Sequence, residues 1–291
     1  MPTNNLPDFD ALWDYEHPAQ TEAAFRQLLP QAEASGDASY HLQLLTQIAR
    51  VQGLQRRFDD AHATLDAVAA RLSDDLALAR VRYLLERGRV FNSSGQPETS
   101  LALFQQAYEL AEAQRFAFHA IDALHMLGIA APPDERMGWN TRALAMAEAA
   151  TDPLAHRWCG SLMNNIGWTY HDAGHFDEAL AMFERALTFQ QAQDDPRLIR
   201  IARWCIGRTL RSLGRTDEAL ALQLALYNDW AASGEQQDGY VSEEIAECLL
   251  ALERTAESRP YFAEAYALLS RDPWLVAQEP QRLQRLRDLS T

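Results

Sequence analysis

The sequence contains no lysine, so each of its 26 basic side chains belongs to an arginine. Aspartate and glutamate outnumber them with 41 residues, and the formal net charge is −15. This balance argues against a nucleic-acid partner, because affinity for a duplex depends on cations that neutralise phosphates. Arginine is nevertheless well suited to carboxylates, since its planar guanidinium can bind both oxygens of one carboxylate.

Cysteines are few, and long apolar runs are missing. The three cysteines are far apart and lack CxxC spacing, which favours free thiols in a reducing compartment. No apolar run approaches the ~20 residues needed to span a bilayer. The first residues do not combine a basic start with an apolar stretch, so we expect no signal peptide and no membrane partner. These features predict a cytoplasmic globular protein.

No stretch alternates like a β-strand, and the pattern that is present is an internal repeat. Residues 166–187, IGWTYHDAGHFDEALAMFERAL, match residues 206–226, IGRTLRSLGRTDEALALQLAL, in two glycines and in the run Asp-Glu-Ala-Leu. Steps of about 40 residues from Gly167 reach a small residue each time. These small residues are Ala49, Gly88, Gly128, Gly207 and Ala246. Six copies in register predict an all-α fold.

Each copy has the pattern of two helices. The first helix carries the small residue where its neighbour packs closest, and the second repeats apolar residues at helical spacing, as in Ala179, Phe183 and Ala186. Helix starts are indicated where an aspartate precedes a proline, because the acid can cap the helix and proline suits the first turn. Such starts occur at Asp152-Pro153, Asp195-Pro196 and Asp272-Pro273.

The pattern resembles the tetratricopeptide repeat, in a longer variant of about 40 residues. The motif positions of that family are occupied by Ile166-Gly167, Tyr170, Ala179, Phe183 and Ala186. The resemblance implies a right-handed superhelical solenoid of antiparallel helix hairpins, with about six full repeats and a capping helix at each end.

We expect one continuous solenoid with three parts: an N-terminal capping partial hairpin at 1–36, six repeats at 37–270 and a C-terminal capping helix at 271–291. In the first part, we expect Phe9, Leu12 and Trp13 to pack on Phe25 and Leu28; in the last, we expect Pro280 to split the helix.

The third copy departs from the pattern. It has Asn140 where a small residue is expected and Pro132-Pro133 at a helix end, which predicts altered stacking there.

The resemblance also implies a binding surface. In such arrays the first helix of each repeat lines a concave face where partners bind, and the residue after the repeat glycine faces this groove together with residues one turn away. The groove is therefore expected to be basic and aromatic. Its candidate residues are Arg82, Arg89, His125, Asn164, Trp168, His171, Arg200, Trp204, Arg208, Arg211 and Tyr240.

Arginine, tryptophan and asparagine together offer forked donors, flat faces and amide groups, which favour a peptide or partner-protein segment that is acidic or bears a carboxylate. Two alternatives remain open. Arg208 and Arg211 could instead pair with glutamates 243, 244 and 247 on the next helix, in a scaffold that forms a homodimer. The groove could also hold a small anion, as in a sensor.

Two known specialisations of such repeats fit the sequence poorly. A carboxylate clamp for chaperone C-termini would use Asn165, but Ile201 and Cys205 stand where its basic residues are expected. The layout is also similar to peptide-sensing bacterial regulators, which carry a helix-turn-helix for which this sequence has no room.

The sequence offers no catalytic motif. It contains no Walker loop, no GxSxG and no HExxH, and no GxGxxG that follows a strand. His171 and His175 are four residues apart, but His175 falls in a predicted turn, so the two need not share a face as metal ligands. We therefore predict a protein that is not an enzyme and that uses no cofactor and no metal.

Overall fold

The computed structural model describes residues 6–234 and 236–291. In this part of the chain the secondary structure is helical, without strands, which confirms the all-α prediction. The chain divides into two compact units, Met1–Leu162 and Met163–Thr291. The boundaries predicted at residues 36 and 270 concern the repeat alignment and stay a prediction. None of the described helices is long and apolar enough to cross a bilayer.

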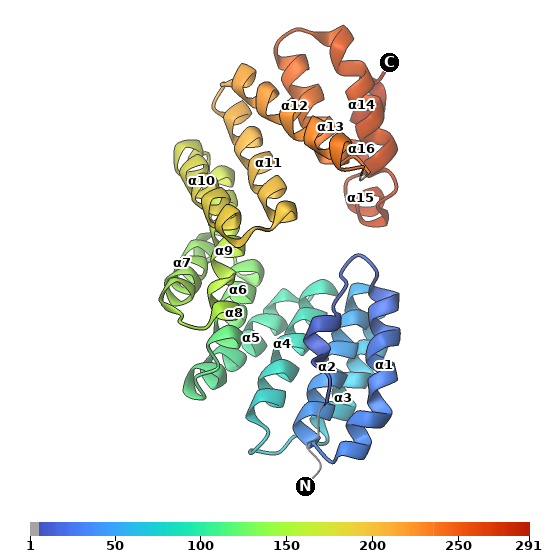
Figure 1. The fold of residues 1–291 in the computed structure, drawn as a ribbon, viewed down its shortest axis with the longest axis vertical. Coiled ribbons are helices and arrows are strands. Elements are labelled where there is room, and N and C mark those ends of the chain that lie inside the picture. Colours follow the sequence, from blue (N-terminus) through green and yellow to red (C-terminus); the bar gives the residue numbers. More distant parts are fainter. Residues whose placement is uncertain (1–5, 235) are drawn as a thin grey trace. The chain divides into compact units, whose positions relative to one another are not determined.

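Unit 1 consists of antiparallel helices preceded by a short 3-10 helix (Figure 1). Its elements are η1 (Phe9–Leu12), α1 (Pro18–Ser35), α2 (Ala38–Leu54), α3 (Phe58–Ala69), α4 (Ala77–Ser93), α5 (Pro97–Ala113), α6 (Ala117–Ala130), α7 (Pro133–Ala149), α8 (Pro153–His156) and the start of α9 (Trp158–Asp172). Helices adjacent in sequence pack on each other, and α4 also contacts both α2 and α6. The first helices of successive hairpins therefore lie next to one another, and we call them the inner helices.

Unit 2 continues the same pattern from the rest of α9. Its other elements are α10 (Phe176–Gln193), α11 (Pro196–Ser212), α12 (Thr216–Ser233), α13 (Gly239–Ala251), α14 (Thr255–Leu269), α15 (Pro273–Gln278) and α16 (Pro280–Leu289). As predicted, the last helix is divided at Pro280. Leu283 and Leu286 of α16 are 7 % and 0 % exposed and join the core formed by Phe262.

The repeat glycines mark the points where two helices of a hairpin come closest. A Cβ atom on Gly167 would lie 2.5 Å from Cε1 of Phe183, which is fully buried on α10. In the third copy a Cβ on Gly128 would lie 2.5 Å from Oδ1 of Asn140. Asn140 therefore occupies the place of this phenylalanine, and its predicted assignment to a small-residue position was wrong because the turn before α7 is shorter. Glycine is favoured at these positions because a Cβ atom would force the partner side chain to shift.

Most of the hairpins turn through a residue in the left-handed conformation. In unit 2 this residue is Gly174, Gly214 or Glu253, with φ of 79°, 76° and 61°. The third copy has no such residue, since Ala131 is extended and Pro133 begins α7 directly. The altered packing predicted at the two prolines thus takes the form of a shorter turn.

The three cysteines lie on consecutive inner helices. Cys159 is on α9, Cys205 on α11 and Cys248 on α13, each at most 1 % exposed. All three are in the described part of the chain and none forms a disulfide, as the sequence predicted. Burial raises the pKa of Cys205 and of Cys248 to about 12.

Candidate functional site

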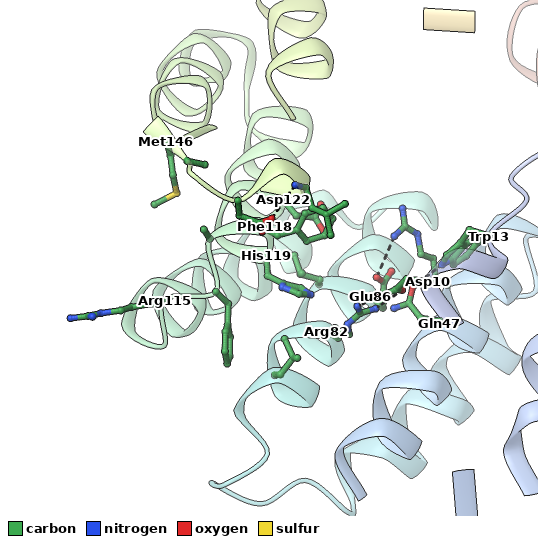
Figure 2. Close-up of a pocket in the computed structure, with 18 of the residues that line it drawn as sticks. Asp10, Trp13, Gln47, Arg82, Glu86, Arg115, Phe118, His119, Asp122 and Met146 are labelled. Atoms are coloured by element: carbon green, nitrogen blue, oxygen red, sulfur yellow. Dashed lines mark hydrogen bonds and ion pairs between the residues drawn. The ribbon is translucent and has the colours of Figure 1, made fainter. Parts of the chain in front are cut away.

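Unit 1 contains a cavity of about 1270 Å³ on the side formed by its inner helices. Helices α2, α4 and α6 contribute its floor, the segment around η1 forms one end, and the region from α7 to α8 forms the other. Figure 2 shows Trp13 and Asp10 at the first end and Met146 and Arg115 toward the second. The two ends differ in chemistry.

The floor of the cavity holds a network of buried charges. Arg89 donates to Oε1 of Glu86 over 2.7 Å and also to Asp122 of the next inner helix. Glu86 and Asp122 are only 2 % and 4 % exposed. Burial raises the pKa of Asp122, but the Arg89 guanidinium outweighs it, so the pKa is lowered and the carboxylate stays ionised. Arg50 lies 3.7 Å from the same Glu86 oxygen.

Two histidines of α6 are neutral at pH 7. Burial lowers the pKa of His119 and of His125 to about 4. The His125 ring packs on Trp158 with centroids 4.9 Å apart, and His119 packs on Phe118 at 5.2 Å. Of the two, only His119 lines the cavity, and His125, a predicted groove residue, packs on Trp158 instead.

The N-terminal segment packs on α1. Phe9 is 5 % exposed, and its ring lies 6.5 Å from that of Phe25, with Trp13 on the same ring at 5.3 Å. Leu12 is 40 % exposed. The predicted packing is therefore observed for the two aromatic residues, whereas Leu12 does not join the core cluster of Phe9 and Phe25 on which Trp13 and Leu28 pack.

The same segment forms the polar end of the cavity. Asp10 pairs with Arg82 of α4 through both carboxylate oxygens, one of them at 2.9 Å from Nη1. Trp13 donates from Nε1 to Oε1 of Gln47 on α2 over 3.2 Å. The Arg50 guanidinium lies over the Trp13 ring at 5.1 Å. Predicted groove residue Arg82 therefore lines the cavity but already binds a carboxylate of its own chain.

The opposite end is apolar with one cation at its edge. Phe118 lines it together with Met146 of α7 and Leu154 of α8, which is 58 % exposed. Arg115 is in the left-handed conformation, φ 59°, in the turn before α6, and lines the cavity. It forms no ion pair with any residue in the described part of the chain.

In unit 2 the predicted aromatic residues pack on each other. Trp168 contacts Trp204 at 5.8 Å and Phe183 at 5.3 Å between ring centroids. Trp204 donates from Nε1 to the backbone oxygen of Tyr240 over 3.1 Å. The structure thus brings these three predicted residues together, with each tryptophan half-buried against the next helix.

The predicted arginines of α11 are paired within the chain. Arg211 binds both oxygens of Glu244 over 2.8 and 2.9 Å, and Nε of Arg208 lies 3.2 Å from Glu244 Oε1. Arg208 also donates to Ser212, which lies 3.0 Å from Nε2 of His171. Burial lowers the pKa of Arg208 and of His171. Both arginines thus pair with Glu244 on the next inner helix, as the alternative of a groove neutralised by its own ion pairs proposed.

The two neighbouring glutamates pair with the C-terminal helix. Glu243 accepts two hydrogen bonds from Arg282, over 2.9 and 2.6 Å, and Glu247 pairs with Arg285. Glu243 and Glu247 are therefore paired with arginines of α16, not with those of α11 as the self-paired alternative proposed. The three glutamates of α13 are therefore paired with arginines of α11 and α16.

Two further predicted residues lie at the edges of this group. Asn164 accepts a hydrogen bond from Sγ of Cys205 over 3.4 Å. The Arg200 guanidinium lies 4.4 Å from the centroid of Trp230 on α12, so it stacks on the outer helix of its own hairpin. Both side chains are held by neighbours within unit 2.

Several residues of the cavity were missed at the sequence level. Gln47 and Arg50 follow from the rule that the residue after the repeat position faces the groove, because Ala49 is that position in the first copy. Asp10 and Trp13 had no such signal, since they lie outside the repeats. His119 lies one turn before Asp122 and could have been found by extending the same stripe.

No cluster of three or more histidine, cysteine or acidic side chains that could hold a metal is found among residues 6–234 and 236–291. His171 faces Ser212, whereas His175 stands at the start of α10 with its ring 6.3 Å from that of Tyr170. The two histidines are therefore directed to different neighbours.

Comparison with known proteins adds a family match and several structural likenesses. Residues 160–192 match the family described as tetratricopeptide repeat. No protein of curated function matches the sequence.

Among solved structures, NprR in complex with its cognate peptide NprX is 17 % identical, with a TM-score of 0.61, and the match covers 96 % of this chain and 81 % of NprR. The apo form of RapI is 11 % identical with a TM-score of 0.68, over 91 % of this chain and 74 % of RapI. A tetratricopeptide repeat protein from Parabacteroides merdae is 14 % identical with a TM-score of 0.56, over 95 % and 98 % of the two chains. At these identities the likeness shows the fold.

Proposed function

We propose, on the premise that this chain is a tetratricopeptide-repeat protein, that it binds a peptide or a segment of a partner protein on the inner face of unit 1. The observation that carries the proposal is the cavity across α2, α4 and α6. Its volume of about 1270 Å³ exceeds the ~300–1,000 Å³ of most small-molecule pockets. A ligand longer than a metabolite suits it better.

The chemistry of the two ends supports a peptide with distinct parts. Phe118, Met146 and Leu154 offer contact to apolar side chains, whereas the other end offers charged and hydrogen-bonding groups. NprR, a protein of similar fold, has been solved with a peptide bound. The likeness makes the same class of ligand a reasonable proposal for this chain, in a binding role rather than a catalytic one.

A preference for an acidic or carboxylate-bearing ligand rests on two arginines. Arg115 has no ion pair among the described residues, and Arg50 lies only at 3.7 Å from Glu86. Both line the cavity, one toward each end. Arg82 and Arg89 contribute less positive charge, because Asp10, Glu86 and Asp122 already neutralise them.

The predicted residues of unit 2 have a different role in this proposal. Trp168, Trp204, Arg208 and Arg211 are satisfied by contacts within the unit. We assign them to holding successive hairpins together, and we place ligand binding in unit 1.

The proposal can be tested with peptides selected from a displayed random library against the full-length chain. For each selected peptide, Kd is measured by calorimetry for wild type, Arg115→Gln and Met146→Ala. We expect at least tenfold weaker binding to each variant. Glutamine keeps the length of the arginine side chain and removes only its charge.

Arg259→Gln is the matched control, because Arg259 is exposed on α14 and does not belong to the cavity lining. It should bind every selected peptide like the wild type. Equal Kd values for wild type and both cavity variants would refute ligand binding at this cavity.

A further inference from the structure

We infer that the ligand presents a carboxylate and, three residues later, an aromatic ring, because the chain's own N-terminal segment already presents this pair to the inner face of unit 1. The inference rests on the proposed function and specifies the ligand of the same site. Residues 8–15, DFDALWDY, act as an internal substitute for the ligand, with Asp10 and Trp13 as the two contact residues.

The segment contacts three helices, α1, α2 and α4. Its start is fixed by the Tyr40 hydroxyl of α2, which donates to the Pro7 carbonyl over 2.8 Å. Its end is fixed by Thr21 of α1, which exchanges two hydrogen bonds with the backbone of Asp14, over 3.1 and 2.9 Å. Between these points the chain forms the short η1 helix and brings Asp10 and Trp13 to the inner face.

The acidic contact is made on α4. Asp10 binds the Arg82 guanidinium with both oxygens, although the two residues are 72 apart in sequence. The Arg82 side chain is 12 % exposed and that of Asp10 is 43 % exposed. The arginine is therefore a fixed part of the surface, whereas the carboxylate reaches it from the solvent side and can be exchanged.

The aromatic contact is made on α2. Trp13 donates to Gln47, stacks on Tyr15 with centroids 4.8 Å apart, and lies 5.1 Å below the Arg50 guanidinium. Arg50 is thus placed over an aromatic face, an arrangement that any ring entering at this position would reproduce.

The fit of the internal segment is incomplete. Nε of Arg82 and Oε2 of Glu86 are buried and have no hydrogen-bond partner among the described residues. A buried donor or acceptor without a partner disfavours the conformation that contains it. The two residues are one turn apart on α4, and both line the cavity.

An incoming peptide can supply what the segment does not. A single residue with an extended backbone presents its N–H and C=O on the same side, as in strand pairing. Such a residue would flank the turn that carries the acid and the ring, because side chains three residues apart lie on the same side of a 3-10 turn but on opposite faces of an extended strand. Its carbonyl would accept from Arg82 and its N–H would donate to Glu86. A ligand with the same acid and ring, and with a better-placed backbone, would therefore displace the segment.

The occupant is a partner peptide rather than a second copy of this chain. With a formal net charge of −15, two copies repel each other. A short peptide carries far less charge than a second copy and brings its carboxylate to Arg82 against less repulsion.

The test uses a fluorescein-labelled synthetic peptide with residues 6–17, LPDFDALWDYEH, and the full-length chain. Fluorescence anisotropy gives Kd for wild type and for Asp10→Asn, which weakens the internal contact to Arg82. We expect at least tenfold tighter peptide binding to Asp10→Asn. Asp59→Asn, an exposed acid on α3 with the same change of charge, should bind like the wild type.

Two altered peptides test the required chemistry. Each altered peptide is added unlabelled to compete with the labelled one for the Asp10→Asn chain. Asparagine at the position of Asp10, or alanine at the position of Trp13, should each abolish this competition. The chain variant Arg82→Gln should also lose binding. Equal Kd for wild type and Asp10→Asn, or equal competition by the altered peptides, would overturn the inference.

The failure of this inference is distinguishable from that of the proposed function. If library-selected peptides depend on Arg115 and Met146 but are not displaced by the 6–17 peptide, the inference fails and the proposed function stands. If Asp10→Asn becomes a dimer by light scattering and binds no peptide, the occupant is a second copy and the inference fails.

Discussion

At the scale of single residues, the two helices of a hairpin pack closely because the inner helix has a glycine, without a side chain, at the contact point. Gly167 leaves the space that the Phe183 ring fills, whereas Gly138 on α7 has nothing within 4 Å of where a Cβ would lie. The same residue type therefore has opposite effects on stability at the two positions.

Gly167→Ala should lower the free energy of unfolding by about 1–3 kcal/mol, because the new methyl group overlaps a buried ring. Gly138→Ala should raise it by roughly 0.5–1 kcal/mol, since alanine favours the helix and meets no neighbour. Urea titrations followed by circular dichroism measure both. Loss of stability in both variants would contradict the packing role of Gly167.

Burial of the α6 histidines makes stability depend on pH. Since the pKa of His125 is about 4 in the folded chain and about 6.5 when unfolded, the unfolded state takes up the proton first. The contribution of His125 to the free energy of unfolding is therefore fully present above pH 6.5 and is lost as the pH falls toward 4.

His125→Gln should reduce the loss of unfolding free energy between pH 7 and pH 5 by about 1–2 kcal/mol relative to wild type. Denaturant titrations at the two pH values measure the difference. An unchanged loss in the variant would show that His125 is protonated equally in both states.

At the scale of elements, most of the hairpin turns contain a residue in the left-handed conformation, which is a glycine in some turns and a residue with a side chain in others. Gly214 occupies the left-handed position of its turn at no steric cost, while Glu253 holds the corresponding position in the last repeat with φ of 61°. A side chain at this conformation costs roughly 1–2 kcal/mol.

Glu253→Gly should therefore raise the free energy of unfolding by about 1 kcal/mol, and Gly214→Ala should lower it by a similar amount. Thermal unfolding of both variants provides the measurement. A decrease for Glu253→Gly would mean that the side chain makes a contact that outweighs the strain.

The sequence predicted the pairing of helices because close packing requires a small residue at one place, and Gly88, Gly128, Gly167 and Gly207 are visible without a structure. It could not predict which of the three glutamates forms the ion pair with Arg211, since that depends on the rotation of α11 relative to α13. Nor could it place Asp10 on Arg82, because such a contact leaves no periodic trace.

At the scale of the whole molecule, packing between hairpins is local. Helix α16 packs mainly on α14, and Leu286 at that interface is fully buried. In arrays whose repeats contact only their neighbours, a defect is felt mostly by adjacent repeats. Damage at the C-terminal end should therefore leave the proposed binding surface of unit 1 intact.

Leu286→Ala should accelerate amide hydrogen exchange in α13, α14 and α16 and leave α2, α4 and α6 unchanged. The substitution removes about 2–5 kcal/mol of core packing. Val276→Ala, at a side chain that is 50 % exposed on α15, should alter neither region. Equal acceleration throughout the Leu286→Ala chain would show that it unfolds as one cooperative body.

The buried thiols provide a built-in reporter of such motions. Cys159, Cys205 and Cys248 each belong to a different inner helix and are closed to solvent. A thiol reagent can react only after the hairpin around its target has opened. The labelling rates of the three sites, separated by peptide mapping, would therefore give the opening free energy along the chain, helix by helix, without introducing any probe.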